Sequence, residues 1–166
     1  IHIHPEGSIL PITHNERRNT IDFPYIRHID VCCGGMGGWS SAVNASCSLS
    51  RIVTQCAIDI CPDATTAHSN VHPHIPTITS DIRFLRTQIY MSTAHIITAS
   101  IPCQPFSHAG SMHDHLDTRD LSNCIGDILH NIFPPVLIIE NVHHYLHSYA
   151  YTSLRSRAMQ HAYKVL

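Results

Sequence analysis

A cysteine between two prolines is the residue in this chain best suited to chemistry. Cys103 lies in the stretch SIPCQPFS (residues 100–107), directly after the apolar run AHIITA. A thiolate at the end of a buried strand can attack an electrophilic carbon and later leave again, which suits covalent catalysis. A free cysteine is also a small buried hydrophobe in many proteins, so the residue type alone leaves both interpretations open.

A glutamate ends another apolar run, VLII, and an asparagine follows it. Adjacent strands of a parallel sheet lie ~5 Å apart, so we expect the carboxyl of Glu140 and the thiol of Cys103 to face one substrate. We interpret the run before Glu140 as buried, and a buried carboxylate is costly unless it is paired or used. The alternative is an ordinary strand-end acid that caps a helix.

A glycine-rich turn, CCGGMGGWS (residues 32–40), comes before both residues. Glycines permit positive φ and let a ligand approach the backbone, while the helix N-terminus that follows favours an anionic group. Asp59 stands where an acid binds ribose hydroxyls in such folds. The later glycine of a dinucleotide site and the G-K-[ST] of a P-loop are absent, which favours another nucleoside-containing cofactor. A plain tight turn and an ordinary strand-end carboxylate are the alternatives.

The elements that must position these residues alternate between strands and helices. The predicted strands are Tyr25–Cys32, Arg51–Ile60, a short one in TITSDIR (77–83), Ile96–Ile101 and VLIIENV (136–142). The predicted helices are Trp39–Ser50, one opened by Pro62 and closed by His72 and Pro73, Phe84–Ser92, Asp120–Phe133 and Ser153–Ala162. This alternation predicts an α/β, Rossmann-like parallel sheet covered by helices on both faces, with ligands at the carboxyl ends of its strands.

Composition limits the classes of function. The 166 residues suit one domain, which we place at 26–166 after an N-terminal arm at 1–25. No apolar run nears the ~20 residues of a membrane span and no signal pattern opens the chain, so we expect a soluble, intracellular protein without membrane contact. The net charge is −2, so the basic surface that nucleic-acid binding requires must lie elsewhere if such binding occurs.

The histidines and cysteines do not predict a metal site. The 16 histidines are scattered and the seven cysteines include no C-x-x-C pair. His143 and His147 are at i,i+4 and could bind a metal if they lie on a helix, but compositional bias explains the histidines better.

The motifs, in their order, resemble the DNA cytosine-5 methyltransferase family. CGGMGGWS, the acid after the second strand, PCQPFS and IIENV match the family's signature, and LDTRD (116–120) resembles its DSRG segment. The resemblance covers about residues 26–166 and implies a class I S-adenosylmethionine-dependent methyltransferase fold. It also implies a sheet that is incomplete at its C-terminal end, without the sixth strand, the Q-x-R-x-R segment and the target recognition region.

The resemblance implies a mechanism. The Cys103 thiolate would add to C6 of a cytosine flipped out of DNA, with Glu140 acting as an acid at N3 and Asn141 fixing the cysteine loop. The methyl group would come from S-adenosylmethionine. Cofactor contacts are implied for Cys33, Gly35, Gly37, Gly38, Asp59 (ribose), Ile60 (adenine ring), Asp81 (adenine amino group), Ile82 and Pro102. DNA contacts are implied for Gln104, Ser107 and Arg119.

Several features depart from the family pattern. One extra residue separates Asp30 from the final glycines, a cysteine replaces an aromatic residue near the adenine, and Asp120 replaces the glycine of DSRG. A tRNA cytosine-5 methyltransferase is an alternative, because the motif that would decide the substrate lies in the absent region. A catalytically inactive, cofactor- or partner-binding relative is another alternative. The resemblance further implies a C-terminal target recognition half as a partner, and a nuclear location in a eukaryote or a cytoplasmic one in a bacterium.

Overall fold

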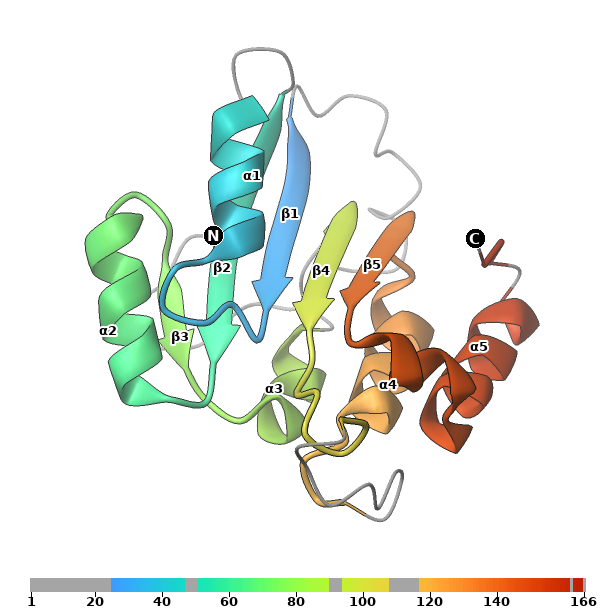
Figure 1. Ribbon diagram of the computed structural model, residues 1–166. Helices are drawn as coiled ribbons and strands as arrows, with labels where there is room; N and C mark the ends of the chain where they lie inside the picture. Colours follow the sequence, from blue (N-terminus) through green and yellow to red (C-terminus); the bar gives the residue numbers. More distant parts are fainter. Residues whose placement is uncertain (1–24, 47–50, 90–93, 108–116, 162, 166) are drawn as a thin grey trace.

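The sheet is parallel throughout. The computed structural model describes residues 25–46, 51–89, 94–107, 117–161 and 163–165. Within them, the five strands lie in the order β3-β2-β1-β4-β5 (Figure 1). The predicted α/β class is confirmed. The strand order reverses between β1 and β4, which is where open α/β sheets bind ligands at the carboxyl ends.

The elements agree with the predicted ranges to within a few residues. The strands are β1 (Ile26–Val31), β2 (Ile52–Asp59), β3 (Thr77–Thr79), β4 (Ile96–Ser100) and β5 (Val136–Glu140). The helices are α1 (Gly38–Ser46), α2 (Pro62–Val71), α3 (Ile82–Ile89), α4 (Ser122–Ile132), the 3₁₀ helix η4 (His143–His147) and α5 (Tyr149–Gln160). The sequence did not predict η4 or the first turn of α5. Residues 1–24, 47–50, 90–93 and 108–116, which contain most of the predicted arm and parts of two helices and a loop, lie outside the described residues.

The apolar core lies between the sheet and the helices α3, α4 and α5. Helices α1 and α2 cover the opposite face (Figure 1). Helix α4 presents Ile125, Ile128 and Leu129 to the core, at the three- and four-residue spacing of an amphipathic helix, and all three are at most 1% exposed. Strand β1 contributes Ile29 and Val31 on the same side.

The face of the sheet beneath α1 and α2 is packed with polar side chains. His28 is fully buried, and its ring nitrogens lie 2.9 Å from Thr54 Oγ1 and 2.8 Å from Thr98 Oγ1. Asp30 is also fully buried, and its Oδ2 accepts hydrogen bonds from the backbone N–H (3.0 Å) and the hydroxyl (2.7 Å) of Ser40. Because buried polar groups are costly unless hydrogen-bonded, this network specifies how α1 sits on the sheet.

Strand β5 differs from the prediction, which had it as a buried run. Its residues alternate, with Val136 and Ile138 43% and 39% exposed, and the Glu140 side chain is exposed. Leu137 and Ile139 pack on the core, but no described residue pairs with the outer edge of β5 or covers its other face. The inference that burial forces Glu140 to be paired or used is therefore wrong.

Among the described residues, no helix has both the length and the apolar character needed to cross a bilayer.

Candidate active site

The loop that carries Cys103 is anchored by apolar residues on either side of it. Ile101 and Phe106 are 3% and 4% exposed, and the backbone N–H of Phe106 donates to the Cys103 carbonyl at 2.9 Å. The Phe106 ring packs edge-on against Tyr145 of η4, with 4.9 Å between the ring centroids. Cys103 is partly exposed and Gln104 is exposed. The loop therefore has a rigid apolar base and presents its thiol and its glutamine near the surface.

Strand β5 brings Glu140 and Asn141 beside this loop. Glu140 is the register partner of Ser100, the last residue of β4. Asn141 Nδ2 donates to the Ile101 carbonyl at 3.1 Å, two residues before Cys103. The tips of β4 and β5 are thus joined by a side-chain hydrogen bond. Cys103, Glu140 and Asn141 lie on one edge of the sheet, and their chemical roles stay predictions.

Asp59 fixes the glycine turn as well as standing where a ribose is expected. Its Oδ2 accepts from the Gly34 N–H and its Oδ1 from the Cys61 N–H, both at 2.9 Å. The Cys33 N–H donates to the Ile58 carbonyl at 3.1 Å, which joins the ends of β1 and β2. A carboxylate offers about four acceptor positions, so Asp59 can still accept hydroxyl groups.

The glycine turn needs glycine for two different reasons. Gly34 and Gly37 have φ values of +61° and +56°, which L side chains rarely adopt. A Cβ on Gly34 would meet nothing within 4 Å, whereas a Cβ on Gly37 would lie 2.6 Å from the ring of His68. A Cβ on Gly35 would lie 3.1 Å from Ala67 Cβ, and one on Gly38 would meet nothing within 4 Å. The turn is therefore packed against α2 at Gly35 and Gly37, and has free space at Gly34 and Gly38.

His68 is a structural residue that the sequence did not single out. Its ring is fully buried and lies 3.1 Å from Ser40 Oγ and 2.9 Å from Thr77 Oγ1. Burial lowers its pKa, with His72 contributing, so the ring is neutral near pH 7. The chain Asp30–Ser40–His68 links the sheet, α1 and α2 directly behind the glycine turn. The residues around His68 (TTAHSN, 65–70) are small and mostly polar, so the local sequence does not indicate that its ring is buried.

Three other cysteines are unsuited to nucleophilic attack. Burial raises the pKa values of Cys32 and Cys33 to about 12, with Asp59 and Asp30 as further causes, and that of Cys56 to about 11. These thiols stay protonated at neutral pH, and the thiolate is the reactive form. Cys33, predicted to contact the cofactor, is 7% exposed and packs on a small core cluster. Any cofactor contact there would therefore be made by its backbone.

Asp81, the acid predicted to bind adenine, is already paired. It lies between β3 and α3, and the Arg83 guanidinium donates to both of its oxygens, from Nε at 3.0 Å and 2.9 Å. Hydrogen bonds from the Arg83 side chain lower the pKa of Asp81. Arg83 Nη1 also donates to the Thr118 carbonyl at 3.2 Å. The sequence analysis missed Arg83, although its spacing from Asp81 repeats that of Arg119 from Asp117.

The other predicted cofactor residues are distributed unevenly. Ile60 is 61% exposed, next to Asp59, and is free to contact a ring. Ile82 is only 4% exposed and belongs to the core, so its side chain does not face a ligand. Pro102 is partly exposed, as is Ser107, which was predicted to contact DNA rather than the cofactor. Trp39 Nε1 donates to Ser100 Oγ at 3.1 Å, which ties α1 to the tip of β4.

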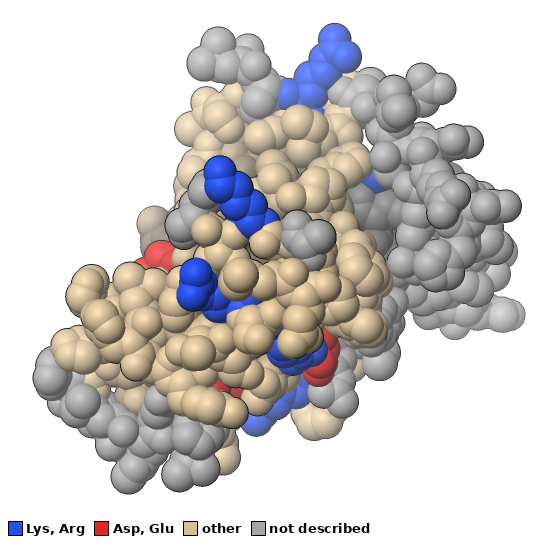
Figure 2. Space-filling view, turned by 90° about the vertical axis from the view of Figure 1, so that its right-hand side faces the viewer, with Lys and Arg blue, Asp and Glu red and all other residues tan. Residues whose placement is uncertain are grey.

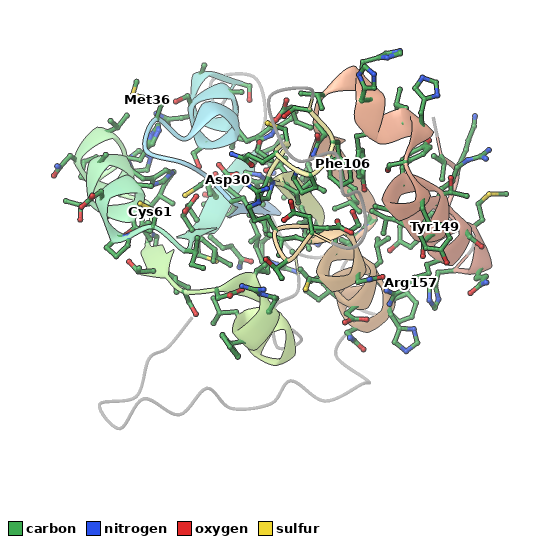
Figure 3. The ribbon with its side chains drawn as sticks, turned by 60° about the horizontal axis from the view of Figure 1, so that its bottom comes forward. Asp30, Met36, Cys61, Phe106, Tyr149 and Arg157 are labelled. Atoms are coloured by element: carbon green, nitrogen blue, oxygen red, sulfur yellow. The ribbon has the colours of Figure 1, made fainter. Side chains whose placement is uncertain are left out.

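Seen from the carboxyl edge of the sheet, the glycine turn and the cysteine loop lie on opposite sides of Asp30. Figure 3 shows Met36 and Cys61 on one side of Asp30 and Phe106 on the other. Met36, in the middle of the turn, is 75% exposed. The residues present fit S-adenosylmethionine: acids at the tips of β2 and β3, an exposed apolar side chain between them, and a turn with free space at two glycines.

The described residues contain no cluster of three or more histidine, cysteine or acidic side chains able to hold a metal ion. His143 and His147, the pair considered above for metal ligation, lie on η4 with ring centroids 5.1 Å apart. On the face that Figure 2 shows, the basic side chains of the described residues are separated by uncharged surface. This face has no continuous basic patch of the kind that binds a phosphate backbone.

Comparisons with solved structures identify the fold. The Dnmt2 methyltransferase of S. pombe matches with a TM-score of 0.65 and 24% identity, over 82% of this chain and 40% of that one. A mutant of DNMT2 from Spodoptera frugiperda matches with a TM-score of 0.64 and 22% identity, over 81% of this chain and 41% of that one. A protein described as a DNA modification methyltransferase, encoded within an E. coli prophage, gives 0.60 and 20%, over 81% and 37%.

These structures share the class I methyltransferase fold, and the chain spans about two fifths of their length. A search of curated protein sequences found no match. The family model for C-5 cytosine-specific DNA methylases matches residues 26–163, which is most of the chain and includes every residue of the site described above. The chain belongs to the C-5 cytosine-specific DNA methylase family.

Proposed function

We propose that this chain is the catalytic and cofactor-binding part of an enzyme that methylates C5 of cytosine in DNA. The observation that carries the proposal is the junction of the β4 and β5 tips, where Asn141 holds the loop of Cys103 beside Glu140. The glycine turn lies at the same edge of the sheet, across Asp30. A thiol, a carboxyl and a cofactor turn at one edge are what a covalent methyl transfer needs.

In the proposed reaction, the Sγ of Cys103 forms a bond to C6 of a cytosine. The C5–C6 double bond opens toward C5 while Glu140 donates a hydrogen bond or proton at N3, which stabilises the negative charge that moves onto the ring. S-adenosylmethionine, once bound, would supply the methyl group to C5 and leave as S-adenosylhomocysteine. A base then removes the C5 proton. The electron pair of the broken C5–H bond restores the C5–C6 double bond, and the C6–S bond breaks to release the Cys103 thiolate. The exposure of Glu140 means that the bound cytosine itself must shield this carboxyl from water.

The chain's own residues would hold the cofactor from three sides. Asp59 accepts the ribose hydroxyls while it keeps its bonds to the glycine turn, and Asp81 accepts the adenine amino group. Ile60 packs on the adenine ring. The glycine turn receives the methionine end at the N-terminus of α1, where backbone N–H groups favour its carboxylate. These assignments apply the family pattern to side chains whose positions allow them.

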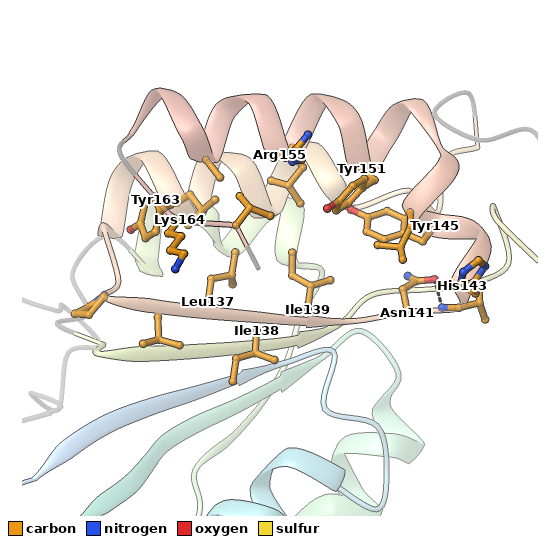
Figure 4. A pocket seen from close by; sticks show the side chains of 18 residues that line it. Leu137, Ile138, Ile139, Asn141, His143, Tyr145, Tyr151, Arg155, Tyr163 and Lys164 are labelled. Carbon is orange, nitrogen blue, oxygen red and sulfur yellow. Dashed lines mark hydrogen bonds between the residues drawn. The ribbon is translucent and has the colours of Figure 1, made fainter.

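We further propose that a target recognition half supplies most of the DNA contacts. The described basic side chains on the face in Figure 2 are dispersed, and no described strand pairs with the outer backbone edge of β5. Beside β5 a groove of about 750 Å³ runs along α5, with Leu137, Ile139 and Tyr151 on its walls (Figure 4). An apolar groove next to an open strand suits the docking of further polypeptide. The enzyme would act where DNA is, in the nucleus of a eukaryote or the cytoplasm of a bacterium.

The test is covalent trapping. Duplex DNA with 5-fluorocytosine and labelled S-adenosylmethionine is incubated with the chain alone and with the chain fused to a target recognition region. We expect a denaturation-resistant adduct that Cys103→Ala abolishes and that Cys61→Ala, at a more exposed cysteine, retains. An adduct formed only with 5-fluorocytosine tRNA would favour the tRNA enzyme. No adduct in any combination would refute the catalytic proposal.

A further inference from the structure

Two Asp-x-Arg turns of the same geometry face each other beside the proposed adenine site. In the first, the Arg83 backbone N–H donates to Asp81 Oδ1 at 2.9 Å and the guanidinium binds the same carboxylate. In the second, the Arg119 N–H donates to Asp117 Oδ1 at 2.9 Å, and its Nη2 donates to Oδ2 at 2.6 Å. The repeated geometry shows that each arginine is fixed by the aspartate two residues before it.

Arg83 joins the two turns. Its Nη1 donates to the carbonyl of Thr118, the central residue of the second turn, at 3.2 Å. One guanidinium therefore binds the carboxylate predicted to read adenine and the backbone of the turn that carries Arg119. The Asp81 side chain is 12% exposed and that of Arg83 is 45% exposed, so the bridge lies at the surface of the site.

Most of the acceptor capacity of Asp81 is taken up by three N–H groups of Arg83, because the single Nε–H is shared between the two carboxylate oxygens. Oδ1 accepts from the backbone N–H and the Nε of Arg83, at 2.9 Å and 3.0 Å, and Oδ2 accepts from Nε and Nη2, at 2.9 Å and 2.5 Å. A carboxylate has about four lone-pair positions. An adenine amino group that approaches Asp81 therefore competes with the Arg83 guanidinium for the carboxylate oxygens.

We propose that Arg83 is a positioning residue that couples occupancy of Asp81 to the placement of the turn carrying Arg119. This inference rests on the proposed function, because it takes the adenine amino group as the ligand of Asp81. When a ligand displaces the guanidinium from Asp81, Arg83 binds the Thr118 carbonyl less firmly. The turn that carries Arg119 is then released. Coupling of this kind is reciprocal, so a DNA contact that draws the turn away from Arg83 favours the cofactor.

A purely structural role is the competing explanation. Exposed ion pairs contribute little to folding stability, so Arg83→Ala is expected to unfold no more easily than the wild type. Arg157 offers a matched control, because its guanidinium also joins a carboxylate and a carbonyl, Asp127 Oδ1 at 2.7 Å and Asn123 O at 3.1 Å. That bridge ties α5 to α4 and involves neither Asp81 nor the turn that carries Arg119.

The first measurement needs no cofactor. Amide hydrogen exchange is followed at Arg119 and Asp120, whose N–H groups donate within the second turn. We expect Arg83→Ala and Asp81→Ala each to speed exchange about two- to tenfold, the effect of losing one hydrogen bond. The double variant should match the single ones, and Arg157→Ala should leave both amides unchanged. Unchanged exchange in Arg83→Ala, or additive effects in the double variant, would overturn the proposal.

The second measurement adds S-adenosylmethionine. In the wild type we expect faster exchange at Arg119, and in Arg83→Ala a cofactor dissociation constant about two- to tenfold lower, because the competing guanidinium is gone. Weaker binding by this variant, or binding by the wild type without any change at the turn, would overturn the coupling. If the wild type binds no cofactor while the double-variant result holds, the bridge stands and the proposed function fails.

Discussion

The four glycines after β1 allow backbone strain and side-chain packing to be measured separately. Gly34 has a positive φ with free space around it, Gly37 has a positive φ and close packing against His68, and Gly38 has free space without a positive φ. Alanine therefore introduces backbone strain alone at Gly34, and backbone strain with steric overlap at Gly37. At Gly38 it introduces neither strain nor overlap. The structure predicts three different stabilities from one chemical change.

The magnitudes follow from these environments. Gly34→Ala should lower the free energy of unfolding by about 1–2 kcal/mol, the cost of a Cβ in the left-handed region. Gly37→Ala adds an overlap with a buried ring 2.6 Å away, which costs about 1–3 kcal/mol more. Gly38 is the first residue of α1. Gly38→Ala should raise the free energy of unfolding by about 0.4–1 kcal/mol, because alanine lowers the conformational entropy of the unfolded chain.

The assay is urea denaturation of the three variants beside the wild type, followed by far-UV circular dichroism. The informative quantity is the difference between Gly37→Ala and Gly34→Ala, because backbone strain cancels in it. The same comparison is made in a His68→Ala background. There the difference between Gly37→Ala and Gly34→Ala should be smaller, because the overlapping ring is gone. Equal stability of Gly34→Ala and Gly37→Ala would show that His68 does not pack on the turn, and would refute the description of this side of the site.

Two further predictions concern the core and the buried histidines. Phe106→Ala should lower the free energy of unfolding by about 3–5 kcal/mol by emptying a site that is 4% exposed, whereas Phe84→Ala, at 78% exposed, should stay within about 0.5 kcal/mol in the same denaturation assay. Burial lowers the pKa values of His28 and His68, so the unfolded chain binds protons that the folded chain does not. Stability should therefore be full above about pH 7 and fall as the pH drops through the ordinary histidine value of about 6.5. His68→Gln should make this pH profile shallower, and an unchanged profile would show that His68 is not buried in its neutral form.

The order of the elements could be predicted because each element is encoded locally. Apolar runs of strand length, glycine and proline at their ends, and the three- and four-residue spacing in α4 are properties of a few neighbouring residues. The strand-tip position of Cys103 follows from the same local pattern. The motifs are recognised by their residues and their order along the chain, which do not depend on how the elements pack. The candidate site could therefore be predicted from the sequence together with the fold.

What the sequence could not show depends on residues far apart in the chain. His28 and Thr98 are 70 residues apart, and Arg83 and Thr118 are 35 apart, so no local pattern indicates either contact. The exposure of β5 was missed for a related reason. Its apolar residues have the composition of a buried strand, and only the arrangement of the sheet shows that one face and one edge of β5 are uncovered by the described residues.

The cysteine loop and the glycine turn are held in place by different interactions. We therefore expect them to lose their structure under different conditions. The cysteine loop rests on apolar contacts of Phe106 and Tyr145, which are insensitive to pH. The glycine turn rests on hydrogen bonds that run through Asp30, Ser40 and His68, and protonation of the histidine would place a new charge in this buried network. Mild acid should therefore loosen the cofactor side while the cysteine loop stays in place. A site built in this way would lose its hold on the cofactor before it lost the geometry of its nucleophile.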